Sequence, residues 1–182
     1  MTDDISKQKS IVLGGGCFWC LEAVYNRIKG IKAISGYAGG TTKNPTYKQV
    51  ITGRTGHAEV VKLNYDPTTI SLMTILEIFF DIHDPTTLNR QGNDIGTQYR
   101  SIILYLTNEE KEIIQDAIKE AQKKWPDSIV TEVIELEVFY KAENYHQGYY
   151  EKNPNQGYCR VIIRPKLNKL QKEILPKLEY MK

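Results

Sequence analysis

Near its N-terminus, the chain passes from a strand pattern into a glycine turn and then into a helix pattern. Residues 9–15 are apolar enough for a buried strand, and residues 17–29 have the spacing of a helix that ends at Gly30. Three consecutive glycines precede Cys17 at the junction, and glycine lets the backbone turn and pass close to a ligand. The sequence therefore predicts a strand that leads directly into a helix, with a thiol at the helix start.

A thiol at a helix start is expected to be unusually acidic. The first N–H groups of a helix have no partner within it, and the positive end of the helix dipole lies there. Both effects favour a thiolate, so we expect a lowered pKa for Cys17 and a nucleophilic sulfur at neutral pH. Phe18 and Trp19 follow directly and would form an apolar wall beside the sulfur. These residues indicate an enzyme whose substrate is partly apolar.

The predicted elements from residue 9 to residue 106 follow the order β-α-β-β-α-β. After the first strand and helix come strands at 31–35, 58–65 and 101–106, a helix at 71–82, and two long loops at 36–56 and 86–98. This order is that of a ferredoxin-like core, so we predict an α+β two-layer sandwich. Loops of this length in a compact domain are usually functional.

The rest of the chain extends this core. A capping box at Thr107 opens a helix that continues to Trp125, residues 129–139 alternate like a strand, and an exposed helix is expected from Lys166. Neither a repeat nor a linker divides the sequence. We expect one domain over residues 1–182, with a core at about 9–165 and a C-terminal tail at 166–182.

Charge and composition exclude several classes of protein. The 182 residues include 24 basic and 22 acidic side chains, a net charge of +2, which gives no electrostatic case for nucleic acid or a membrane surface. The sequence lacks a secretory signal and any apolar run long enough for a membrane span. Three cysteines are too few for a secreted disulfide scaffold. We expect a cytoplasmic monomer with reduced thiols.

Cys17 and Cys20 form a Cys-x-x-Cys pair, which is compatible with a zinc site, a redox dithiol or two inert core thiols. A structural zinc ion needs four ligands. The chain would have to add Cys159 and one of three histidines, His57, His83 or His146. None of these lies in a second ligand pair, so we favour redox or nucleophilic chemistry and expect neither metal nor cofactor.

Four further residues lie where the glycine-bearing loops meet strands or turns. Glu59 is either a solvated glutamate or, if it is buried near Trp19, a carboxyl with a raised pKa that holds a proton at pH 7. Tyr37 and Tyr99 are either packing residues or hydroxyl donors, and Asp94 is either a turn former or a site residue.

Six sequence blocks resemble, in this order, the A-type peptide methionine sulfoxide reductases. They are GCFW, GYAGG, GHAEV, IHDPT, GNDIGTQYRS and NYHQ, at residues 16–19, 36–40, 56–60, 82–86, 92–101 and 144–147. The resemblance covers about residues 10 to 165, and six blocks in order are far more specific than one.

The resemblance implies a reaction and a role for each matching residue. The family reduces the S epimer of methionine sulfoxide, free or in proteins, without a cofactor, and thioredoxin is the usual final reductant. Cys17 would attack the sulfoxide sulfur. A protonated Glu59 would donate to the sulfoxide oxygen, and Tyr37 and Tyr99 would add hydroxyl donors. The substrate-binding residues implied are Phe18 and Trp19 for the S-methyl group and Asp94 for the substrate backbone.

The resemblance leaves the second thiol open. The family commonly has glycine where this chain has Cys20, whereas Cys159 matches the recycling cysteine of many members. A resolving thiol attacks a cysteine sulfenic acid to form a disulfide. We favour Cys159 as the first resolver because its loop looks flexible, with Cys20 as the alternative or as a second step. A general thiol–disulfide oxidoreductase and a zinc-stabilised peptide-binding module remain as alternative functions.

Overall fold

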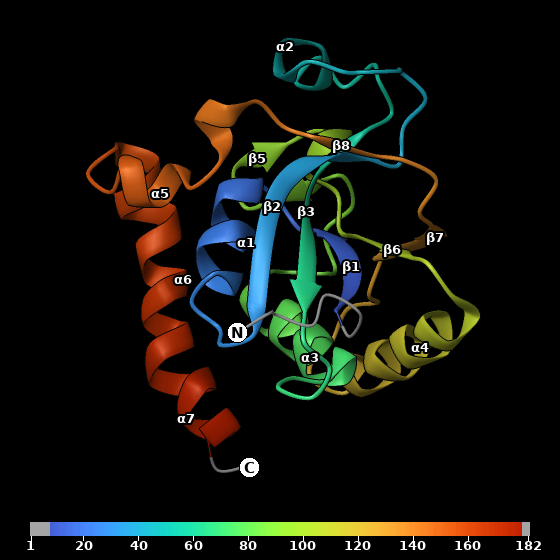
Figure 1. Cartoon of the computed structure of the whole chain (residues 1–182), viewed down its shortest axis with the longest axis vertical. Coiled ribbons are helices and arrows are strands. Elements are labelled where there is room, and N and C mark those ends of the chain that lie inside the picture. Colours follow the sequence, from blue (N-terminus) through green and yellow to red (C-terminus); the bar gives the residue numbers. More distant parts are fainter. Residues whose placement is uncertain (1–7, 180–182) are drawn as a thin grey trace.

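The computed structural model describes residues 8–179, which form a six-stranded sheet with helices around it (Figure 1). The sheet order is β7-β6-β1-β3-β2-β8, and every neighbouring pair is antiparallel except β6 and β7. The strands span Lys9–Gly14 (β1), Ile31–Ala38 (β2), Ala58–Tyr65 (β3), Ile102–Tyr105 (β6), Glu132–Glu135 (β7) and Phe139–Lys141 (β8). Arg90–Gln91 (β4) and Asp94–Ile95 (β5) form a separate two-stranded hairpin.

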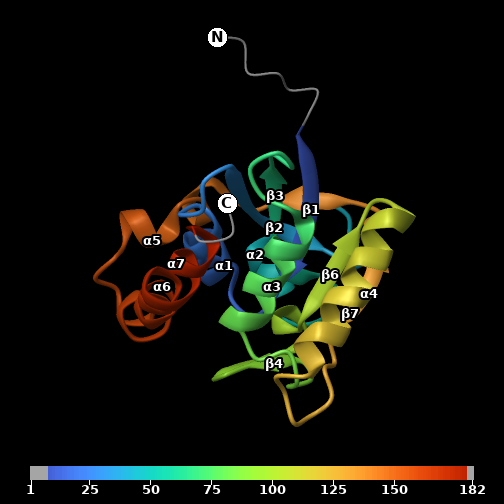
Figure 2. The ribbon, with the colours of Figure 1, turned by 90° about the horizontal axis from the view of Figure 1, so that it is seen from below.

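Three longer helices follow sheet strands: Phe18–Tyr25 (α1), Leu72–Ile82 (α3) and Asn108–Gln122 (α4). Short helices occur at Tyr47–Val50 (α2) and Tyr149–Lys152 (α5), and 3₁₀ turns at Thr97–Tyr99 and Asn144–His146. A helical run closes the described chain, with π-type turns at Cys159–Ile163 and Leu170–Ile174 alternating with Arg164–Lys169 (α6) and Leu175–Glu179 (α7). This run lies alongside α1, and Figure 2 shows α3 beside α4.

Local sequence explains where the helices begin. The Ser71 side chain accepts the Thr74 N–H at the start of α3. Thr107 and Glu110 form a reciprocal capping box at the start of α4, as predicted. Thr46 and Gln49 do the same for α2, inside the loop predicted at 36–56. Each cap satisfies N–H groups that would otherwise have no partner.

The two faces of the sheet bury different clusters. Alternate residues of β1 show this, because Ile11 and Leu13 join the large cluster with the helices and Val12 joins a small one on the opposite face. Leu136 and Phe139 pack against the small cluster. The helices therefore contribute to the larger core, and the predicted α+β class is confirmed.

Three expectations about elements are wrong. Residues 129–139 do not form one strand, because β7 and β8 pair with opposite edges of the sheet. The strand predicted at 31–35 continues to Ala38, paired with β3 and β8. The C-terminal helix is not simply exposed, since Leu167, Leu170 and Ile174 form a stripe buried in the large cluster. Among residues 8–179, no helix has the length and apolarity needed to cross a membrane.

Candidate functional site

Cys17 is the residue at which the glycine turn becomes α1. It is the N-cap of the helix, and its side chain makes no capping hydrogen bond. Gly16 before it has a φ of +91°, a conformation that favours glycine, and its N–H donates to the Tyr99 carbonyl at 3.2 Å. The turn thus joins the thiol to the segment that carries Tyr99.

The environment of Cys17 differs from the sequence-based expectation. The side chain is only 8% exposed. Burial, followed by the nearby charges of Glu59 and Cys20, raises the pKa of the Cys17 thiol well above its ordinary value. The Trp19 amide N–H acts in the opposite direction but does not prevail. The prediction of an acidic thiol is wrong here because desolvation, a tertiary effect, outweighs the helix terminus.

Glu59 projects from β3 into the same site and is 1% exposed. Its Oε2 accepts the Phe18 N–H at 3.2 Å, and its carboxyl also hydrogen-bonds the Cys17 thiol. Burial raises the pKa of Glu59 to about 8. At neutral pH this carboxyl therefore holds a proton next to the sulfur.

The tyrosines around Glu59 are in two different environments. The Tyr37 hydroxyl donates to Glu143 Oε1 at 2.9 Å, so its proton is already engaged. Burial, then the charge of Glu59, raises the pKa of Tyr99. Tyr47, a residue that the sequence analysis missed, has its pKa raised to about 12 by burial and by the charges of Glu59 and Cys17.

An aromatic wall lies beside the thiol. Phe18 is fully buried, and its ring centroid is 5.7 Å from that of Tyr37. The Trp19 indole stacks on Tyr149, with centroids 3.6 Å apart and planes 4° from parallel. Its Nε1–H donates to His146 Nδ1 at 3.0 Å. The two residues after Cys17 thus present apolar surfaces held by neighbouring rings.

A cavity of about 430 Å³ adjoins the two cysteines. The β4–β5 hairpin and the C-terminal helical run line it together with Cys17 and Cys20. Asp94 lies in this lining, and its Oδ2 accepts the Tyr158 hydroxyl at 2.6 Å. The same hydroxyl is 3.8 Å from Cys20 Sγ. Tyr158 therefore joins the hairpin to the second thiol.

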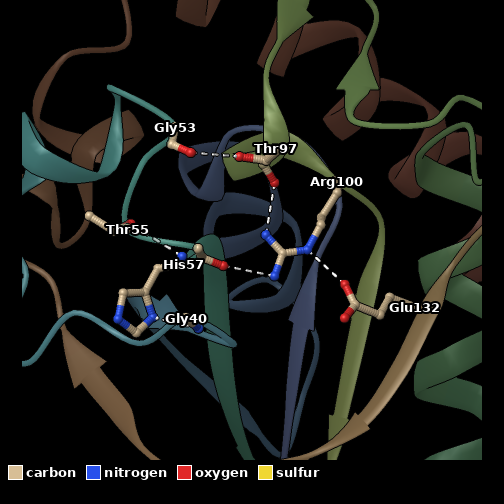
Figure 3. A network of polar contacts seen from close by, with 8 residues as sticks. Gly40, Gly53, Thr55, His57, Thr97, Arg100 and Glu132 are labelled. Carbon is tan, nitrogen blue, oxygen red and sulfur yellow. Dashed lines mark hydrogen bonds and ion pairs between the residues drawn. The ribbon is translucent and has the colours of Figure 1, made fainter.

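A polar network centred on Arg100 fastens the two long loops to each other (Figure 3). Its guanidinium donates to Glu132 Oε2 at 2.7 Å, to the Thr97 carbonyl at 2.9 Å and to the Gly56 carbonyl at 3.0 Å. His57 Nδ1 accepts the Gly40 N–H at 3.0 Å within one of these loops. These bonds fix the loop that carries Tyr47 relative to the segment that carries Tyr99.

Comparisons with known proteins decide the family. The family model described as peptide methionine sulfoxide reductase matches residues 9–179. This chain belongs to that family. The peptide methionine sulfoxide reductase MsrA of Paenarthrobacter aurescens is 56% identical over 165 residues, which are 90% of this chain and 95% of that protein.

Two solved structures of Mxr1 from Saccharomyces cerevisiae are also similar. The reduced form has a TM-score of 0.81 and 39% identity, over 86% of this chain and 91% of that one. Mxr1 in complex with Trx2 has a TM-score of 0.58 and 28% identity, over 82% and 89% of the two chains. The chain is accordingly an oxidoreductase that reduces methionine sulfoxide.

In this reductase, Tyr47 could have been found from sequence. Asn44, Pro45 and Thr46 precede it, and a threonine followed three residues later by a glutamine predicts a helix start. A helix start inside a glycine-rich loop fixes the direction of the next side chain. That Tyr47 lies close to Glu59 and Cys17 depends on tertiary packing and could not be predicted from the sequence.

The reductase holds its two other thiols in buried positions. Cys20 is one turn along α1, and its N–H donates to the Cys17 carbonyl at 3.1 Å. Cys159 begins a π-type helical turn and is 0% exposed, so the expected flexible loop is wrong at this residue. All three cysteines are free thiols, and burial raises the pKa of both Cys20 and Cys159.

The three histidines considered as zinc ligands are each engaged in hydrogen bonds. His57 and His146 accept from Gly40 and Trp19, and His83 Nε2 lies 2.8 Å from the Ser101 hydroxyl. Within residues 8–179, no group of three or more His, Cys, Asp or Glu side chains is arranged to hold a metal ion.

Proposed function

We propose that this reductase acts on the S epimer of methionine sulfoxide, free or in oxidised proteins, with Cys17 as nucleophile and thioredoxin as final reductant. The observation that carries the proposal is the protonated, buried Glu59 carboxyl beside the Cys17 thiol. A sulfoxide oxygen is a poor leaving group as an oxide, so it needs a proton and hydrogen-bond donors as the S–O bond breaks.

The first step oxidises Cys17 and reduces the substrate. The sulfur of Cys17 attacks the sulfoxide sulfur and forms a bond to it. The oxygen then passes to the Cys17 sulfur as its bond to the substrate sulfur and the new S–S bond break, which gives a cysteine sulfenic acid and methionine. Glu59 gives its proton to the sulfoxide oxygen, and the Cys17 thiol proton restores the carboxyl. The hydrogen bond between these two groups supports this transfer. The raised pKa of Cys17 keeps the thiol protonated until substrate arrives.

Tyr47 and Tyr99 are the hydroxyl donors to the oxygen in this proposal. The charge of Glu59 acts on both phenols, as it does on Tyr37, but the Tyr37 hydroxyl alone of the three donates to Glu143. We propose that Tyr37, expected as a donor, instead orders the site, because its hydroxyl is bonded to Glu143 and Glu143 Oε2 accepts the Tyr47 N–H at 3.1 Å.

Substrate binding uses the aromatic wall and the cavity beside the thiol. Phe18 and Trp19 form the apolar surface for the S-methyl group, which agrees with their stacking and burial. Asp94 binds the substrate backbone from the hairpin, at the rim of the cavity that Cys17 lines.

For the second step we propose that Cys20, rather than Cys159, resolves the sulfenic acid first. Residues three apart in a helix have a Cα separation within the roughly 7 Å limit for a disulfide. The Cys20 sulfur attacks the Cys17 sulfur, and the S–O bond of the sulfenic acid breaks. The hydroxyl leaves as water with the proton of the Cys20 thiol, and a Cys17–Cys20 disulfide remains. Cys159 would need the first turn of its helical run to open, so we assign it to a later exchange toward thioredoxin.

The remaining proposals concern architecture and context. The central order β6-β1-β3-β2, with helices α1 and α3 as crossovers, supports a ferredoxin-like core. We propose a single domain, because the C-terminal run shares the large core cluster. We also propose a monomer, and a cytoplasmic location that agrees with three free thiols.

An assay with separated epimers tests this function. The reduced protein is given either the S or the R sulfoxide. Steady turnover is followed with dithiothreitol present, and methionine and free thiols are counted after one turnover without any added reductant. We expect turnover of the S epimer only, with one methionine formed and two thiols lost per chain. Mapping the disulfide in Cys159→Ser and Cys20→Ser then decides the order, because our proposal requires a Cys17–Cys20 bond that persists without Cys159.

A further inference from the structure

His146 is a buried titratable residue that has no assigned role in the reaction. It is 1% exposed and lies among aromatic rings. Its centroid is 4.9 Å from that of Phe18, 4.5 Å from Tyr47 and 4.1 Å from Tyr145. It therefore touches the apolar wall and one proposed hydroxyl donor at once.

The hydrogen bond to Trp19 fixes the protonation state of this imidazole. An indole N–H can only donate, so His146 Nδ1 must accept and cannot carry a proton. The proton of the neutral ring is then on Nε2, a buried atom with no hydrogen-bond partner within residues 8–179. A buried donor without a partner is unfavourable, and such groups in native structures usually have a functional reason.

Trp19 depends on this one polar contact. Its ring faces are set by parallel stacking on Tyr149 and by an edge contact with Tyr158, 5.9 Å between centroids. Stacking permits an indole to slide or turn within its plane, whereas a hydrogen bond from Nε1 fixes that rotation. The hydrogen bond to His146 therefore fixes the in-plane rotation of the Trp19 indole.

We propose that His146 is a positioning residue of the reductase, whose neutral imidazole holds the Trp19 indole in the orientation that receives the substrate methyl group. The inference rests on the proposed role of Trp19 in substrate binding. If Nδ1 gains a proton, it can no longer accept, the bond to Trp19 is lost, and the wall for the methyl group loses its fixed position. Binding is then weakened more than the chemical step.

The surroundings of His146 keep it neutral at physiological pH. Burial lowers the pKa of His146 below its ordinary 6.5, and the charge of Glu143 acts in the opposite direction. The titratable groups that face it are Glu143 and Tyr145 from its own segment and Tyr47 from α2, while the residues of α1 that it meets carry no charge. The switch to the cation is therefore expected only below pH 6.5.

Two substitutions separate positioning from packing. His146→Asn places an amide oxygen, which accepts but does not titrate, near the position of Nδ1. His146→Leu fills the space without an acceptor. We expect His146→Leu to raise KM for the S sulfoxide about tenfold, with kcat within about twofold, and His146→Asn to recover most of that loss. The ratio of wild-type to His146→Asn kcat/KM should fall as the pH is lowered from 6.5 to 5.

A fluorescence titration reports on the same bond without catalysis. With Trp125→Phe as background, Trp19 is the remaining tryptophan. Its emission should change below pH 6.5 with His146 present and stay constant in His146→Asn. An unchanged KM in a folded His146→Leu protein, or an identical titration in His146→Asn, would overturn the proposal. Inactivity toward both epimers would instead refute the proposed function, and the fluorescence would still decide on His146.

Discussion

Replacing Glu59 with glutamine should make the folded protein more stable, by an amount that grows with pH. The pKa of Glu59 is raised from 4.5 to about 8 in the folded chain, so the folded state binds this proton more tightly than the unfolded state. Between these values the unfolded chain releases the proton first, and stability falls as the pH rises. Glutamine keeps an oxygen for the Phe18 N–H and removes the titration.

The magnitude follows from the two pKa values. Near pH 4.5 the difference in unfolding free energy between Glu59→Gln and wild type should be small. At pH 7 it should reach about 3 kcal/mol, since a shift of one pKa unit corresponds to about 1.4 kcal/mol. That is a large fraction of the roughly 5–15 kcal/mol that stabilises a typical domain.

Urea unfolding of the reduced proteins at pH 5, 6, 7 and 8 measures this difference. Glu77→Gln, on the exposed side of α3, is the control variant. It gives the change in unfolding free energy that a glutamate-to-glutamine substitution causes at an exposed position. The same Glu59→Gln protein should reduce the sulfoxide much more slowly, because glutamine donates a hydrogen bond but no proton. A difference in unfolding free energy that is constant with pH would refute the reasoning.

Three further predictions use matched pairs or pH. Tyr47→Phe should lower kcat about a hundredfold, as loss of one oxyanion donor does, whereas Tyr37→Phe should lower it much less; steady-state kinetics on the S epimer distinguish them. Because burial lowers the pKa of His83 from 6.5 to about 4, the unfolded chain takes up its proton first, and this group should make the protein about 2 kcal/mol less stable at pH 5 than at pH 7. His83→Gln should remove that dependence in urea unfolding. Gly14→Ala would place a Cβ 2.7 Å from a β6 side chain and should cost about 1–3 kcal/mol, measured as a lower Tm, whereas Gly157→Ala has open space and should not.

The local features of the fold were predictable because they depend on neighbouring residues. The helix that starts after Cys17 and the capping box at Thr107 follow from short sequence signals. The alternation of residues 129–139 was also seen, but alternation does not specify strand partners. The two ends of this segment, β7 and β8, lie at opposite edges of the sheet. That arrangement depends on how the segment packs against the small cluster.

Most residues of the proposed site could be named from the sequence, whereas their electrostatics could not be predicted. The position of Cys17 in sequence favours a low pKa, but its burial beside Glu59 reverses the direction. The sequence context of Tyr37 is conspicuous, but its bond to Glu143 was not predictable, nor was the influence of the Glu59 charge on Tyr47. Such outcomes depend on contacts between loops far apart in the chain.

The product of a single turnover tests the central claim most directly. A protein with Cys20→Ser and Cys159→Ser retains only Cys17, and it receives one equivalent of the S sulfoxide without a reductant. Our account predicts about one methionine per chain, with a single added oxygen located at Cys17 by mass spectrometry. Absence of methionine, or an oxygen found on any other residue, would contradict it.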